Sequence, residues 1–182
     1  GYPSIAGVNP VGLMEQRVKR TVEGDLGLYH NLDTLCASAG NAPAVLEDAK
    51  NLRSAYSVPE DESSKNTHLV LTQLAVRLAV ERHCGSLFPV GMGEDTRYVQ
   101  KGKDLSNLPL VIGSGGQVVF SSDPARVLRG AVKREEDKLL LKPRAPAFRL
   151  DDRNILFAAG LMAQSAPETA LHVLKKYLGP IE

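Results

Sequence analysis

The sequence predicts an α/β protein in which a mixed sheet is packed by helices. Segments with helical periodicity alternate with short strand-like segments over most of the 182 residues. In addition, one segment, THLVLTQLAVRLAVERHCG at residues 67–85, is apolar on most of its helical faces. A helix of that kind lies in the middle of a structure, so we expect an apolar central helix near 67–84.

The first part of the chain is predicted to hold little regular structure. Residues 1–16 contain proline, glycine and asparagine too often for a regular element, so we expect an arm or loop. Residues 17–27 begin with apolar residues that alternate with charged ones, which favours a short strand before a turn at Gly24.

Two helices and a loop are expected before the central helix. The spacing of apolar residues predicts a helix over 31–40, with Asn31 as its N-cap candidate, and a second helix over 42–56. Residues 57–66 are polar and acidic and lack apolar periodicity, which predicts a loop.

The second half alternates between strand and helix signals. Strands are predicted at 87–90, 96–100, 108–112 and 138–143. Helices are predicted from Ser122-Asp123-Pro124 to about Val132, over 150–164 with Asp151 or Asp152 as cap, and from a capping box at Ser165–Glu168 to Leu178.

The composition limits the classes of partner. The net charge is +1, so we do not expect a nucleic-acid-binding protein. No stretch approaches the roughly 20 apolar residues of a membrane span, and the N-terminus lacks a signal-peptide pattern. Cys36 and Cys84 have no partner at metal-ligand spacing and are interpreted as buried thiols, with a disulfide or metal site as the alternative. We expect a cytoplasmic protein.

The first residues suggest an incomplete chain. The sequence opens on Gly1-Tyr2-Pro3-Ser4 without an initiator methionine. We therefore expect a fragment in which part of any active site is missing.

A glycine-rich turn is the first candidate site. In LPLVIGSGGQVVF, residues 108–120, a strand-like segment leads into Gly113, Ser114, Gly115 and Gly116. Glycines there allow a sharp turn, and they also let a ligand approach backbone N–H groups that attract anions. The sequence leaves both readings open.

A second candidate is the acidic turn TVEGDLG, residues 21–27. Glu23 and Asp25 lie beside Gly24 and Gly27. Two carboxylates in such a turn can hold a hydrated magnesium ion or orient a water molecule. Alternatively, Asp25 is a turn residue that hydrogen-bonds its own backbone.

Other site classes have less support. Arg77, Glu81 and Arg82 lie on the predicted central helix, where charges need ion-pair partners, water or a bound nucleotide. The four histidines are scattered, which favours packing or surface roles. The sequence contains neither a Walker-type phosphate loop nor a G-x-S-x-G elbow.

Taken together, four segments resemble the C-terminal portion of a known family, the MutL family associated with glutamate mutase, which is unrelated to the mismatch-repair protein of that name. The resemblance covers about residues 17–180. Its segments are VKRTVEGDLGL, LAVRLAVERHCG, VQKGKDLSNLPLVIGSGG and LDDRNILFAAGLMAQSAPETALHVLKKYL.

The resemblance implies a fold and a site. The family is similar to actin, sugar kinases and heat-shock ATPases, whose nucleotide lies between two ribonuclease H-like lobes. Residues 111–116 would then match the adenosine motif, and Glu23, Gly24, Asp25 and Gly27 would border the phosphates. The small-residue helix around Gly160 would pack behind the adenosine motif.

The resemblance also implies which parts are absent. An Asp-x-Gly-x-Thr phosphate hairpin is missing from residues 1–20. The chain therefore resembles only the second, adenosine-binding lobe over 17–182, preceded by the arm 1–16. We do not expect this lobe alone to hydrolyse ATP efficiently, since the groups that position metal and water are missing.

The implied function is that of a chaperone-like ATPase. It would reactivate or maintain an adenosylcobalamin-dependent mutase of the glutamate mutase or aminomutase type, using ATP/ADP with Mg²⁺ and binding no cobalamin itself. Its partner would be the mutase, and a homo-oligomer is compatible with the sequence. Two alternatives are an interaction module that has lost nucleotide binding and a small-molecule kinase, for which the sequence shows no catalytic base.

Overall fold

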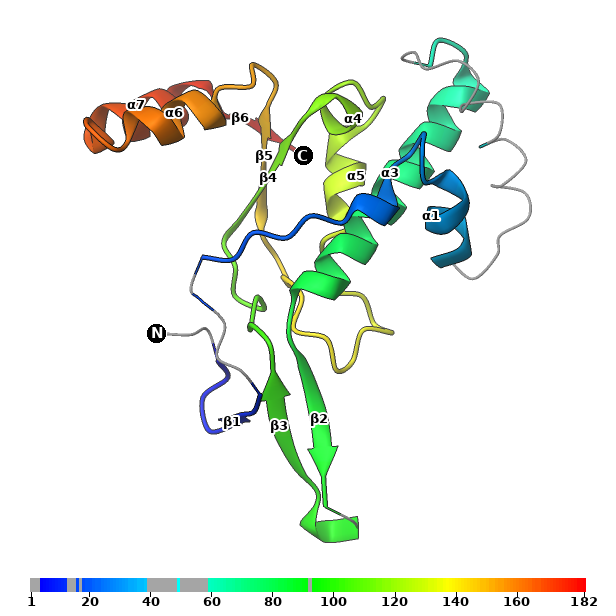
Figure 1. The fold of residues 1–182 in the computed structure, drawn as a ribbon, viewed down its shortest axis with the longest axis vertical. Helices are drawn as coiled ribbons and strands as arrows, with labels where there is room; N and C mark the ends of the chain where they lie inside the picture. Colours follow the sequence, from blue (N-terminus) through cyan, green and yellow to red (C-terminus); the bar gives the residue numbers. More distant parts are fainter. Residues whose placement is uncertain (1–3, 13–15, 17, 39–48, 50–58, 92) are drawn as a thin grey trace.

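The computed structural model describes residues 4–12, 16, 18–38, 49, 59–91 and 93–182. These residues form an α/β fold, which confirms the predicted class at that level. Instead of one mixed sheet, the described chain has two three-stranded sheets, with strand orders β1-β3-β2 and β4-β5-β6. Figure 1 shows the long helix α3 (Glu62–His83) running past the second sheet toward the hairpin of the first.

The first sheet is a hairpin with one added strand. β2 (Ser86–Val90) and β3 (Arg97–Lys101) are antiparallel, and a 3₁₀ helix, η2 (Gly93–Asp95), lies at the tip. Both strands confirm predictions to within one residue. β1 (Asn9–Pro10) pairs in parallel with β3, so the expected arm 1–16 contains a strand.

The second sheet joins parallel and antiparallel strands. β4 (Leu110–Ser114) confirms the strand predicted at 108–112, shifted by two residues. It runs parallel to β5 (Ala147–Asp151), and β6 (Gly179–Ile181) is antiparallel to β5. β5 and β6 were not predicted.

The strand predicted at 138–143 is wrong. Leu140 forms only an isolated bridge with Ser86. The neighbouring residue Leu141 donates its N–H to Gly85 O and accepts a bond from Leu105 N. The backbone of this segment therefore forms separate hydrogen bonds to several neighbouring segments and does not form a regular strand ladder.

The central helix α3 begins at Glu62. Asp61 caps it by accepting a hydrogen bond from Ser64 N at 2.9 Å, so residues 62–66 are helical and the loop prediction is wrong there. Full burial is concentrated in its N-terminal half; the buried residues are Thr67, His68, Leu69, Leu71 and Thr72. Residues 73–81 are all partly covered, as expected of a central helix.

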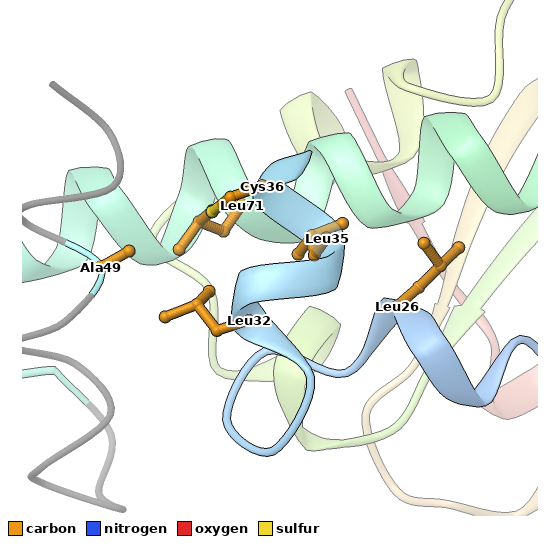
Figure 2. Packing of buried hydrophobic residues seen from close by; sticks show 6 residues of the cluster. All are labelled: Leu26, Leu32, Leu35, Cys36, Ala49 and Leu71. Atoms are coloured by element: carbon orange, nitrogen blue, oxygen red, sulfur yellow. The ribbon is translucent and has the colours of Figure 1, made fainter. Parts of the chain in front are cut away.

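The main apolar cluster lies between α3 and the N-terminal segment (Figure 2). Helix α1 (Leu32–Ser38) confirms the described part of the helix predicted over 31–40, and its buried residues face Leu71. Leu26, from the 3₁₀ helix η1 (Gly24–Leu26), extends the cluster. Burial of these side chains fixes η1 and α1 against α3.

One N-terminal prediction differs from the structure. The strand expected within 17–27 does not form in the described residues 18–23. Asn31 directly precedes α1, where its carbonyl oxygen accepts from Leu35 N at 3.0 Å and its side-chain amide donates to Gly24 O at 2.6 Å. The helix predicted over 42–56 lies outside the described residues, apart from Ala49, which is helical and buried.

Helix α5 (Pro124–Arg129) begins as predicted. Asp123 accepts a hydrogen bond from Arg126 N at 2.8 Å, and Pro124 occupies the first turn. The helix ends three residues before the predicted Val132 and packs on α3. At Gly130 an added Cβ would lie 2.5 Å from Gln73 O, so the two helices approach backbone to backbone.

Helices α6 (Leu156–Met162) and α7 (Pro167–Tyr177) form a hairpin that projects from the second sheet (Figure 1). The capping box at Ser165 is wrong, since the Ser165 hydroxyl bonds Met162 O and Ala166 occupies the cap position. No atom lies within 4 Å of a Cβ built at Gly160. In the described chain, therefore, nothing packs against that smooth position.

None of the described helices has both the length and the hydrophobicity needed for a membrane span.

Candidate functional site

The predicted glycine turn lies at the carboxyl end of β4. Gly113 and Ser114 are the last two residues of the strand, and Gly115 precedes the single-turn helix α4 (Gly116–Val119). Gly115 has φ +88°, a conformation that L-residues rarely adopt. The sharp-turn reading of the sequence is therefore confirmed at Gly115.

The glycines of this turn have different surroundings. A Cβ at Gly113 would lie 2.9 Å from Val118 Cγ1 and 3.1 Å from Leu128, so this glycine permits close packing. At Gly115 no atom lies within 4 Å of an added Cβ, so one side of the backbone is open. A ligand can approach the backbone there, which keeps the second reading of the sequence available.

Asp151 lies beside the turn at the end of β5. Ser114 and Asp151 are register partners in the parallel ladder, and the Ser114 hydroxyl donates to Asp151 Oδ2 at 3.3 Å. Asp151 also accepts bonds from Ile155 N at 2.8 Å and Leu156 N at 3.0 Å, so it binds amides at the start of α6, although Ile155 and not Asp151 occupies the N-cap position. No pattern in the sequence predicts its contact with Ser114.

His68 supports the turn from α3. Its Nε2 lies 2.6 Å from Gln117 Oε1 in α4, and the histidine is buried. With that oxygen as acceptor, Nε2–H is the donor. His68 is therefore a packing histidine, as the sequence favoured, and it is the contact between α3 and the helix that follows the glycines.

The acidic turn lies at the other end of α3. Arg82 Nη1 contacts Glu23 Oε2 at 2.8 Å and both oxygens of Asp25, at 2.9 and 2.8 Å. Hydrogen bonds from these two carboxylates raise the pKa of the Arg82 guanidinium. Gly24 starts η1 and Gly27 ends it in extended backbone, so this segment is a structured turn.

These contacts bear on the expected magnesium ion. The carboxylates of Glu23 and Asp25 already share one cation, Arg82, so in this arrangement they do not form a free set of metal ligands. Across the described residues, no three His, Cys, Asp or Glu side chains are arranged to hold a metal ion. The proposed contact of Asp25 with a metal-bound water stays a prediction.

The structure does not bring the two candidate segments together. The glycine turn is linked to α3 at His68, whereas the acidic turn is linked at Arg82. These positions are about four helical turns apart, or roughly 21 Å along α3 at 1.5 Å per residue. Each segment is therefore a separate candidate site in the described part of the chain.

Charged residues of α3 form a network with the segment 134–142. Lys142, which is fully buried, lies 3.1 Å from Asp137 and 3.4 Å from Glu81. Arg134 lies 3.6 Å from Glu81 and 3.4 Å from Asp137, and Arg77 lies 3.9 Å from Glu81. The ion-pair interpretation of Arg77 and Glu81 is confirmed.

The network changes the ionisation of its buried carboxylate. Burial alone would raise the pKa of Asp137, but hydrogen bonds from the Arg134 backbone and from Lys142 outweigh burial and lower it. Asp137 is therefore held as a charged group by its neighbours.

Both thiols are free; Cys36 is buried, as predicted, whereas Cys84 is only partly buried. Burial raises the pKa of Cys36, and nearby Asp33 adds to the effect. Burial likewise raises the pKa of Cys84. Both environments disfavour the reactive thiolate.

A hollow that the sequence did not indicate lies at the first sheet. A pocket of about 570 Å³ is lined by the hairpin and the N-terminal segment; its lining residues are Gly7, Asn9, Val90, Gly91, Thr96, Arg97, Tyr98 and Val99. Val90 and Tyr98, two apolar residues of this lining, are exposed. None of the predicted site residues lines this pocket.

Comparison with known proteins places the chain in a family. A family model described as MutL protein matches residues 1–178. The chain is 34% identical over 189 aligned residues to Protein MutL of Clostridium tetanomorphum, covering 98% of this chain and 41% of that protein. The chain thus spans about two fifths of the curated relative's length. No solved structure matches it. The chain belongs to the MutL family, as the resemblance of its motifs predicts.

Proposed function

We propose that residues 17–182 are the adenosine-binding second lobe of an actin-like, ribonuclease H-like ATPase, and that this ATPase reactivates or maintains an adenosylcobalamin-dependent mutase. Membership of the MutL family is the observation that supports the proposal most directly. The position of the glycine turn agrees with it. Ligands of α/β sheets bind outside the carboxyl ends of parallel strands, where β4 and β5 end in Ser114 and Asp151.

The glycine turn would receive the nucleoside. Gly115 leaves the backbone open on one side, and Gly113 lets β4 and Leu128 pack closely behind it. Bound ATP with Mg²⁺ would supply a phosphoanhydride whose hydrolysis lets the two lobes open and close around the cleft. This lobe's own residues bind and orient the nucleotide, and the phosphate-positioning groups belong to the rest of the protein.

Calorimetric titration of Mg-ATP against the full-length protein tests nucleotide binding. Gly115→Val should lower the affinity at least tenfold, because φ +88° is strained for a β-branched residue and the side chain fills the open space. Gly160→Ala is the matched control, since Gly160 is helical and has open space around it. Absence of Mg-ATP binding by the full-length protein would show that the nucleotide proposal is wrong.

The acidic turn is tested separately. We propose that Asp25 borders the phosphate end in the assembled cleft. Asp25→Asn should then weaken binding of Mg-ATP more than binding of AMP, which lacks the terminal phosphates. Equal effects on both nucleotides would remove Asp25 from the site and leave the glycine turn unaffected.

The mutase role needs its own assay. Inactivated glutamate mutase or an aminomutase should regain activity when the full-length protein and Mg-ATP are added together. Equal recovery without ATP would contradict lobe closure as the mechanism.

An interaction module without nucleotide binding is the second candidate. The α6–α7 hairpin supports it, because Phe157, Leu161 and Leu171 are 64%, 65% and 52% exposed. A Phe157→Ser, Leu161→Ser variant that keeps the unfolding midpoint of the wild-type protein but loses mutase binding would assign the contact to this hairpin. Unchanged mutase binding would exclude it.

A further inference from the structure

Asp151 is a carboxylate that the sequence identified only as a candidate helix cap. Only 1% of its surface is exposed, and it is the last residue of β5. In the described part of the chain, the salt bridges do not include it. A buried carboxylate without a cation depends on the hydrogen bonds that it accepts.

Those hydrogen bonds come from two different parts of the fold. The Ser114 hydroxyl, inside the glycine turn, donates to Asp151 Oδ2. The amides of Ile155 and Leu156, at the start of α6, donate to Oδ1 and Oδ2. Oδ2 is therefore shared between Ser114 at 3.3 Å and Leu156 N at 3.0 Å.

This sharing gives a direct mechanical connection. The carboxylate is rigidly placed, because β5 pairs with β4 on one side and β6 on the other. If the Ser114 hydroxyl turns to another acceptor, it no longer donates to Oδ2. The hydrogen bond from Leu156 N, the other donor to Oδ2, then changes in strength. The α6–α7 hairpin starts at this point and projects away from the sheet (Figure 1).

We infer that Asp151 is a positioning residue that fixes the Ser114 hydroxyl in the glycine turn and couples the turn to the start of α6. The identity of the ligand as a nucleotide rests on the proposed function, whereas the coupling rests on the hydrogen bonds of Asp151. Asp151 itself does not contact the ligand. Occupancy of the turn is sensed at α6 through the hydrogen bonds that Asp151 accepts.

Amide hydrogen exchange tests the connection without any ligand. In the full-length protein, Ser114→Ala should slow exchange at Leu156 about fivefold, because Oδ2 is then no longer shared with the Ser114 hydroxyl. Ser114→Thr keeps the hydroxyl and should restore the wild-type exchange rate. Asp152→Asn, an exposed neighbour of the same chemistry, is the control and should leave exchange at Leu156 unchanged.

Titration of Mg-ATP then tests positioning. Ser114→Ala and Asp151→Asn should each weaken binding about fivefold, and the double variant should bind no more weakly than the weaker single variant, because both remove one contact. A merely structural cap predicts that Asp151→Asn leaves the affinity unchanged. Ser114→Ala keeps Asp151 and its two amide bonds, so it remains informative if Asp151→Asn does not fold.

The outcomes separate this inference from the proposed function. If the wild-type protein binds no Mg-ATP, the nucleotide proposal fails and the exchange experiment alone decides the coupling. Unchanged exchange at Leu156 in Ser114→Ala overturns the coupling, whatever binds. Affinity losses that multiply in the double variant overturn the positioning role.

Discussion

Replacing Lys142 by methionine tests the buried ion-pair network. Lys142 is fully buried and lies 3.1 Å from Asp137, which is itself 5% exposed at its side chain. Removing one partner of a buried pair costs about 3–5 kcal/mol, because the remaining charge is left uncompensated. Arg134 still donates to Asp137 from its backbone and its side chain, so we expect about 3 kcal/mol, the lower end of that range.

Urea unfolding followed by circular dichroism measures this loss. Methionine is unbranched and only one heavy atom shorter than lysine, so the cavity contribution is small. Lys138→Met is the matched control: Lys138 is exposed, and the free energy of unfolding should change by no more than about 0.5 kcal/mol. A loss below about 1 kcal/mol for Lys142→Met would refute the view that Asp137 depends on Lys142 to compensate its buried charge.

Three further predictions follow from the same structure. The pKa of Asp137 is lower in the folded protein than the ordinary carboxyl value of 3.8, so its ionised form stabilises the fold above that pH. This stabilisation is lost as the pH falls through the lower folded pKa. Asp137→Asn should therefore reduce the change in urea midpoint between pH 6 and 2. Gly130→Ala should destabilise by about 2 kcal/mol or more, because its Cβ would meet Gln73 O at 2.5 Å and backbone cannot yield as a side chain does; an unchanged unfolding midpoint would contradict the close helix contact. Cys36 and Cys84 should react more slowly with iodoacetamide at pH 7 in the native protein than in urea, because burial of Cys36 and partial burial of Cys84 raise both thiol pKa values; equal labelling rates in the two conditions would contradict this effect.

The elements found from sequence are those whose signals are local. The central helix α3 follows from a long segment that is apolar on most helical faces, and the start of α5 follows from Asp123 and Pro124, which act within one turn. The loop predicted over 57–66 is wrong from residue 62 onward, because its polar composition concealed a local helix start. Its polar residues from Glu62 onward form a solvent-exposed first turn, which Asp61 caps, so polarity did not mean irregularity.

The elements that were missed depend on distant partners. β5 gains its hydrogen bonds from β4, 37 residues earlier at the Ser114–Asp151 pair, and from β6 near residue 180. The Asp-Asp pair at its end was read as a helix start. Asp151 accepts hydrogen bonds from Ile155 N and Leu156 N, but the helix begins only at Leu156, after Asn154 has turned the chain with φ +53°.

In the candidate site, too, the locally encoded part could be predicted and the long-range contacts could not. The glycine turn could be predicted, because Gly115 alone supplies the positive φ that the turn needs. Its supports, His68 and Asp151, could not, because nothing in a single sequence states which buried polar groups meet across long loops. For the same reason, the pairing of Arg82 with Glu23 and Asp25 became visible only in the folded chain.

The parallel pairing of Ser114 with Asp151 has a consequence during synthesis. The glycine turn and the residue that holds its hydroxyl are separated by 37 positions. At about 5–20 residues per second, a ribosome needs roughly two to seven seconds to make that stretch. During those seconds Ser114 has no hydrogen bond from its hydroxyl to Asp151, so a nascent chain can complete the glycine turn only after β5 has emerged and paired with β4.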